Sequence, residues 1–367
     1  MDDRINVTKS FLPPIEEFMQ EIQQIWNTHH LTNEGPILKK LEEKLCAFLD
    51  VPYVCIVSNG SLALQLAIRA MNLSGKIATT PFTYVATANA IMWEHCTPVF
   101  IDINPETLAM DLNDLKQKYT DDISAILPTH VYGNACDIEA LNAFAKEKNC
   151  KLIYDGAHTF NVKYKGKAIQ LFGDATTLSF HATKVFHTVE GGAIITQSKE
   201  LYEKLQIMKR HGHQRDDYYF IGTNAKMSEI HAAMGICNLK YIDNIIAIRK
   251  QITQSYDSAL SDLPIRRPKL NPNISQYNYA YYPIMFESEQ DCIRVFNALQ
   301  KENIFPRRYF YPSLNTIPYF NVNHCPVSES VSRKVLCLPL HFNISSNIIQ
   351  IITSIIKKSV NDYKLFK

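Results

Sequence analysis

Lys184 is the residue whose neighbours point most directly to chemistry. It closes the stretch 179–184, SFHATK, and lies between two strand-like runs at 174–180 and 192–197. Small and hydroxyl side chains leave room for a bulky group beside its amine, and the apolar residues that follow favour partial desolvation. Desolvation lowers a lysine's pKa and frees the amine to attack a carbonyl. Lys184 is therefore a candidate for a Schiff base with pyridoxal phosphate (PLP); an exposed surface lysine is the alternative.

Two further strand ends carry groups that suit a phosphorylated aromatic cofactor. Ligands of open α/β sheets bind beyond the carboxyl ends of the strands. The turn SNGS at 58–61 offers the backbone N–H groups of Gly60 and Ser61 at a helix N-terminus, which suits a phosphate, although a simple N-cap is the alternative. Tyr84, in TPFTY at 80–84, could stack on a planar ring or pack in the core.

A fourth strand end carries an acid. Asp155 closes an apolar strand, where a carboxylate is costly unless it finds a partner. A protonated pyridine nitrogen is such a partner and keeps the ring an electron sink, whereas a helix cap is the alternative. Phosphate turn, aromatic ring, acid and lysine follow one another in the order 60, 84, 155, 184, and together they are the parts that a PLP pocket needs.

The elements that must position these groups alternate in type. Short apolar strands alternating with helices predict an α/β sheet covered by helices on both faces. The expected strands lie at 51–57, 77–80, 98–103, 125–131 and 151–154, and the expected helices at 36–50, 62–72, 85–94 and 138–148.

The pattern changes after residue 197. A helix at 199–210, a polar and aromatic loop at 211–224 and a long helix at about 226–250 precede three prolines at 264, 268 and 272. A Tyr-rich strand at 277–286 and helices at 289–302 and 348–358 then indicate a second, smaller α/β unit. We expect a large PLP-binding domain over 1–250, including the N-terminal segment, and a small C-terminal domain over 251–367.

Composition limits the classes of protein to which the chain can belong. The chain has 367 residues and a formal net charge of +2, which gives no reason to expect nucleic acid or an acidic membrane as partner. Its nine cysteines form no C-x-x-C pair, and its twelve histidines show no metal-like clustering, so neither a disulfide framework nor a metal site is expected. No signal peptide or membrane-spanning run is visible, and a cytoplasmic protein is predicted.

Seven motifs in order resemble the fold-type I PLP-dependent sugar aminotransferases known as the DegT/DnrJ/EryC1/StrS family. They are LTNEGP at 31–36, VSNGSLAL at 57–64, PFTYVAT at 81–87, DGAH at 155–158, SFHATK at 179–184, GTNAKMSE at 222–229 and RYFYP at 308–312. The match runs almost from end to end. It implies a mixed, mostly parallel sheet in the large domain, with a smaller C-terminal domain.

The resemblance also implies roles for individual residues. Lys184 would bond to the cofactor's aldehyde carbon and Asp155 would pair with the pyridinium. Gly60, Ser61 and Ser179 would hold the phosphate, Tyr84 would stack on the ring, and Asn224 would reach the phosphate in the neighbouring subunit of a homodimer with shared sites. Many members have Gln where this chain has His158, near the cofactor's phenolic oxygen. Imidazole could make the same hydrogen bond if its tautomer is suitable.

The reaction implied is transamination from L-glutamate to a nucleotide-linked 4-keto-6-deoxy sugar. The stretch 180–192 is similar to members that make dTDP-4-amino-4,6-dideoxy-D-glucose for surface polysaccharide such as O-antigen. The sugar and diphosphate could meet His211, His213, Arg308 and Tyr309, for which a solvated surface turn is the alternative.

Three rival functions are compared with this assignment, and the sequence argues against the second and the third. A 3-keto-sugar aminotransferase would share every cofactor residue. A sugar 3-dehydrase of the same family would carry His where Lys184 stands. A PLP-fold regulatory protein without turnover would bring a DNA-binding module, which is not visible here.

Overall fold

A seven-stranded sheet forms the centre of the computed structural model, which describes residues 4–320 and 324–361. Its strand order is β2-β10-β9-β6-β5-β3-β4. All neighbours pair in parallel except β10, which runs antiparallel to β2 and β9. The strands are β2 (Tyr53–Val57), β3 (Lys76–Thr79), β4 (Thr97–Phe100), β5 (Ile123–Leu127), β6 (Lys151–Asp155), β9 (Ala175–Ser179) and β10 (Gly192–Thr196). Six strands therefore end at one edge, and the predicted mixed, mostly parallel α/β sheet is confirmed.

Helices cover both faces of this sheet, which explains why most residues of its strands are buried. Val54 and Ile56 share a core with α2 (Pro36–Leu49) and α8 (Glu229–Leu239) on one face. The alternate residues of β2 belong to a second core on the other face. That face is covered by α3 (Gly60–Ala70), α4 (Val85–Trp93) and α7 (Lys199–Met208), and farther along the sheet α5 (Leu112–Lys118) and α6 (Ile138–Lys148) enclose a third core.

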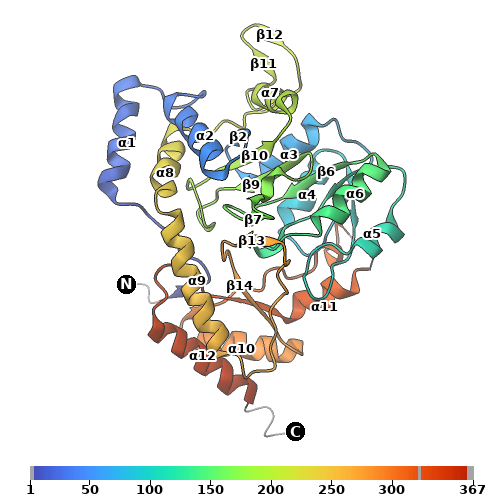
Figure 1. Cartoon of the computed structure of the whole chain (residues 1–367), viewed down its shortest axis with the longest axis vertical. Helices are drawn as coiled ribbons and strands as arrows, with labels where there is room; N and C mark the ends of the chain where they lie inside the picture. Colours follow the sequence, from blue (N-terminus) through green and yellow to red (C-terminus); the bar gives the residue numbers. More distant parts are fainter. Residues whose placement is uncertain (1–3, 321–323, 362–367) are drawn as a thin grey trace.

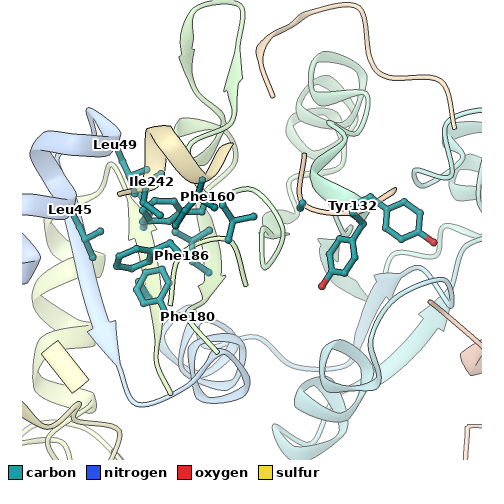
Figure 2. Packing of buried hydrophobic residues seen from close by; sticks show 14 of the residues in the cluster. Leu45, Leu49, Tyr132, Phe160, Phe180, Phe186 and Ile242 are labelled. Carbon is teal, nitrogen blue, oxygen red and sulfur yellow. The ribbon is translucent and has the colours of Figure 1, made fainter. Parts of the chain in front are cut away.

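An aromatic cluster anchors the loop that follows β9. Phe160 and Phe186 stack with ring centroids 4.3 Å apart, and Phe180 meets Phe186 edge to face at 4.9 Å. Figure 2 shows these rings packed near Leu45 of α2 and Ile242. Because the rings lie on either side of residue 184 in the chain, their burial fixes both ends of the segment that carries the lysine.

The C-terminal part has a core of its own. It contains α9 (Ile242–Ala259), α10 (Glu289–Lys301), α12 (Ser346–Asn361) and the antiparallel pair β14 (Tyr282–Met285) and β16 (Val335–Leu338). Figure 1 shows α10 and α12 at one end of the molecule, with α9 reaching them from the side of the sheet. The N-terminal β1 (Ile5–Asn6) pairs in parallel with β15 (Ile304–Phe305) in this part. The boundary predicted at 250/251 lies inside α9, whose Ile245 belongs to the sheet-side core and Ile252 to the C-terminal core.

The single helix predicted at about 226–250 is instead two, because α8 ends at Leu239 and α9 starts at Ile242. Helices α1 (Ile15–Thr28) and α11 (Pro326–Lys334) were not predicted. A hairpin of β11 (His213–Gln214) and β12 (Asp217–Tyr218) projects from the top of the molecule in Figure 1. Three short strands, β7 (Lys163–Tyr164), β8 (Lys167–Ala168) and β13 (Ile274–Gln276), form a separate small sheet. Across the described residues, no helix has the length and apolar character to cross a membrane.

Candidate active site

A cavity of about 370 Å³ opens at the edge where six of the sheet's strands end. It gathers most of the residues singled out in the sequence, although they come from widely separated segments. Its lining includes Gly60, Ser61, Tyr84, Asp155, His158, Ser179, Lys184 and Tyr309. The parallel arrangement explains this meeting, since the loops after β2, β3, β6 and β9 all leave the sheet on the same side.

One wall is a cradle at the start of α3. Asn59 caps the helix, its Oδ1 accepting a hydrogen bond from Leu62 N at 2.8 Å. The amides of Gly60 and Ser61 belong to the first turn, where no helical carbonyl precedes them as partner. A Cβ on Gly60 would lie 2.9 Å from the Cβ of Ser179. Glycine therefore lets the helix start approach the end of β9, and N–H groups and a hydroxyl converge as an anion site requires.

Asp155 lies at the floor of the cavity and is only 5% exposed. Its Oδ1 accepts a hydrogen bond from Ala157 N at 3.0 Å, and its Oδ2 accepts one from Thr87 Oγ1 at 2.7 Å. Burial raises the pKa of the carboxyl, while these two bonds and the nearby Lys184 oppose the rise. A buried acid whose donors favour the charged form suits a cationic partner in the cavity.

A line of hydroxyl groups supports this carboxylate. Thr129 Oγ1 donates to Thr83 Oγ1 at 2.9 Å, and Thr83 and Thr87 lie 3.0 Å apart, oxygen to oxygen. Because the proton of Thr87 is directed at the carboxylate, Thr83 donates to Thr87. All three donors therefore point along one chain toward Asp155.

Lys184 follows β9 in a tight turn, in which its N–H donates to the carbonyl of His181 at 2.9 Å. The side chain is partly buried and lines the cavity together with Asp155. Burial lowers the pKa of the amine from 10.5 to about 8, against the opposing influence of Asp155 and Tyr84. The amine is therefore much closer to its nucleophilic form at neutral pH than a surface lysine is.

The structure defines the tautomer of His158. Its Nδ1 accepts a hydrogen bond from the backbone N–H of Tyr132 at 3.0 Å. Burial lowers the pKa of the imidazole well below its usual value, and the charge of Lys184 adds to this effect. The ring is consequently neutral, with its proton on Nε2, so it can donate to an oxygen of a bound ligand.

Aromatic side chains form the remaining walls. Tyr84 precedes α4 and is 62% exposed, which leaves its ring free to cover a ligand. Tyr281, Tyr309 and Phe310 lie across the cavity, and Tyr281 meets His158 edge to face with centroids 4.8 Å apart. This lining suits a flat aromatic ring.

Four residues that the sequence singled out do not line this cavity. Arg308 pairs with Glu289 at 3.0 Å and stacks on Tyr311. Asn224 accepts a hydrogen bond from Lys226 Nζ at 2.7 Å, and His211 and His213 lie at the base of the projecting hairpin. Their proposed roles are at a neighbouring subunit's site or on the nucleotide, and those roles stay predictions.

Other lining residues were missed in the sequence. Thr83 lines the cavity and Thr87 bonds to Asp155 behind it, and both stand inside the PFTYVAT motif that was quoted for its tyrosine. Arg307 lines the cavity, whereas its neighbour Arg308 was chosen. The arginine pair was visible, but only the fold determines which of two adjacent side chains faces the site.

The residues present fit PLP. The cradle at α3 suits its phosphate, Asp155 its ring nitrogen, His158 its phenolic oxygen, Tyr84 its ring face and Lys184 its aldehyde. A sheet of this topology with such a site defines the class of PLP-dependent aminotransferases.

The chain belongs to the DegT/DnrJ/EryC1/StrS aminotransferase family, whose model matches residues 14–357. It is 40% identical over 365 residues to a dTDP-4-amino-4,6-dideoxy-D-glucose transaminase of Shigella dysenteriae, covering 98% of this chain and 100% of the relative. A transaminase of the same name from Escherichia coli is 36% identical, covering 97% and 98%. The crystal structure of DesI in the presence of its TDP-sugar product superposes with a TM-score of 0.93 at 27% identity, covering 100% of this chain and 95% of that one. The predicted family, enzyme class and cofactor are confirmed.

Proposed function

We propose that this sugar-nucleotide aminotransferase transfers the amino group of L-glutamate to C4 of dTDP-4-keto-6-deoxy-D-glucose. The products would be dTDP-4-amino-4,6-dideoxy-D-glucose and 2-oxoglutarate. The observation that carries the proposal is the full-length similarity to two transaminases named for this amino sugar. The amino sugar would then enter a surface polysaccharide such as O-antigen, and the reaction would take place in the cytoplasm.

The chemistry divides between the cofactor and the chain. PLP, when bound, supplies an electron sink for the negative charge that develops at the amino-bearing carbon. Lys184 Nζ accepts the proton from that carbon of the donor and acts as general acid in the return half of the reaction. Its lowered pKa suits both tasks, because the amine can hold or release a proton near neutral pH.

Two other residues keep the charges in place. The Asp155 carboxylate would hold the ring nitrogen in its protonated form, and the hydrogen bonds from Thr87 Oγ1 and Ala157 N favour the ionised carboxylate. His158 would donate from Nε2 to the phenolic oxygen, since Tyr132 occupies its other nitrogen. The glutamine that many relatives have would donate in the same way through its amide.

A homodimer with shared sites completes the proposal. Asn224 is exposed on its own chain and follows the projecting hairpin, whose Tyr218 is 79% exposed; Ile221, between the hairpin and Asn224, is 80% exposed. Trp93, the last residue of α4, is another large apolar side chain that is mostly exposed, at 72%. Large apolar side chains left in water favour burial against a second subunit, which would bring Asn224 to the partner's phosphate cradle.

The test is the amination product formed from a panel of keto sugars carried on dTDP, UDP and GDP, with glutamate as donor. We expect kcat/KM for dTDP-4-keto-6-deoxy-D-glucose to exceed that for the other carriers by about tenfold or more, as a recognised base and sugar require. A preference for a 3-keto sugar or for GDP would reject this substrate and leave the aminotransferase class intact.

A further inference from the structure

Two neighbouring arginines have opposite environments. Arg308 is engaged by Glu289 at 3.0 Å, by the carbonyl of Arg333 at 2.8 Å and by the ring of Tyr311. Arg307 has no ion pair with any residue of 4–320 or 324–361, and its guanidinium lies 5.4 Å from the ring centroid of Tyr309. A cation without a protein counter-charge is available to a ligand.

The backbone of Arg307 is fixed although its side chain is exposed. Its N–H donates to the carbonyl of Cys337 at 3.1 Å, and the N–H of Cys337 returns a bond to its carbonyl at 2.8 Å. Cys337 is fully buried in β16. The guanidinium therefore starts from a rigid strand edge and borders the same cavity as Lys184.

The charge balance of the cavity shows what Arg307 can do. Lys184 and Arg307 are the only lysine or arginine side chains among the described residues of its lining. Lys184 is committed to proton transfer, and Asp155 and Glu190 contribute negative charge. A permanent cation favours an anionic substrate in this cavity, and among the described lining residues Arg307 is the side chain that provides it.

We propose that Arg307 binds a carboxylate of the amino donor. This inference rests on the proposed function, in which the donor is an amino acid. The donor's α-carboxylate is attached to the carbon that loses its proton to Lys184, so it must lie in the same cavity. The diphosphate of the sugar nucleotide is attached to C1, across the sugar ring from C4, and so lies farther from the reacting carbon. The planar fork of an arginine matches a carboxylate with two parallel hydrogen bonds.

A second cavity beside Arg307 offers this side chain an alternative ligand. Arg307, Thr183 and Tyr309 also border a second cavity of about 760 Å³, which Arg308 and Tyr311 help to line. A diphosphate held there would also satisfy Arg307. The experiment must therefore measure the carboxylate and the phosphate separately.

The experiment compares the wild-type holoenzyme with Arg307→Met and Arg307→Lys by calorimetric titration with two probes. Glutarate is a dicarboxylate that has no amine and cannot react, and dTDP carries the diphosphate without the sugar. We expect Arg307→Met to raise the Kd for glutarate by about 10- to 100-fold, as loss of a charge-assisted pair does, with a dTDP change below about twofold. Arg307→Lys should fall between, because it keeps the charge and loses the fork.

The matched control is Arg69→Met, which removes an equal charge from the pair with Glu94, outside both cavities. It should leave both Kd values unchanged. An unchanged glutarate Kd in both Arg307 variants would overturn the inference, as would a loss confined to dTDP. Failure of the sugar proposal looks different, because wild-type enzyme would then bind glutarate through Arg307 and still leave the dTDP-keto sugar unconverted.

Discussion

Burial gives Lys184 its reactivity by lowering its pKa to about 8. At pH 7.4 a lysine with that pKa is about 20% neutral, against about 0.1% for one near 10.5. We predict that the rate at which the apo-enzyme captures PLP rises with pH through a midpoint near 8. Stopped-flow absorbance would measure it, and a midpoint near 10.5 would contradict the assignment.

The Asp155→Asn variant tests the charge that opposes this lowering of the pKa. Since the carboxylate raises the amine's pKa, its removal should move the midpoint of PLP capture to lower pH. A shift to higher pH would show that the Asp155 carboxylate does not raise the pKa of the Lys184 amine.

Thr87 acts on the cofactor through Asp155. Its hydroxyl lowers the pKa of the carboxyl, so we predict that Thr87→Val raises that pKa and moves the acid limb of PLP binding to higher pH. The affinity for PLP should fall by about tenfold, the usual effect of one hydrogen bond to a charged group. Fluorescence titration at several pH values measures both effects. Thr87→Ser restores the hydroxyl and should behave as wild type, and an equal loss in both variants would assign the effect to packing.

At the scale of elements, the phosphate cradle depends on close packing between a helix start and a strand. A Cβ on Gly192 of β10 would lie 2.6 Å from the carbonyl oxygen of Asn59, the cap of α3. We predict that Gly192→Ala shifts the start of α3, costs about 1–3 kcal/mol of stability and weakens PLP binding more than about tenfold. Pyridoxal, which lacks the phosphate, is the control ligand. If both ligands lose affinity equally, the cradle does not hold the phosphate.

The sequence predicted some of the elements and site residues, and others only the structure could reveal. Asp155 and Lys184 were predictable because Asp155 closes one strand and Lys184 comes shortly after another, and parallel strands bring their ends together. The break between α8 and α9 was not, because apolar spacing continues across Lys240 and Tyr241. Arg307 was not predictable either, since only its pairing with Cys337 orients it. Periodicity reports which side of an element is buried, but long-range pairing decides where irregular segments point.

At the scale of the whole molecule, the proposed dimer makes each site depend on two chains. We predict that Lys184→Ala and Asn224→Asp are each nearly inactive, and that mixing the unfolded and refolded chains restores about a quarter of the wild-type sites. Half of randomly paired dimers are mixed, and each mixed dimer has one intact site. Turnover of the mixture measures this recovery. Activity no greater than the sum of the separate variants would mean that each chain builds its site alone.

Transfer of the glutamate nitrogen to C4 of the sugar can be tested directly with an isotope label. The enzyme would be incubated with ¹⁵N-labelled L-glutamate and dTDP-4-keto-6-deoxy-D-glucose, and the product examined by NMR. We predict ¹⁵N bonded to C4 of the sugar, one 2-oxoglutarate per amino sugar formed, and no product with Lys184→Ala, which should still bind PLP. Label at C3 would contradict amination at C4. An amino sugar without label, formed by active wild-type enzyme, would contradict glutamate as the donor.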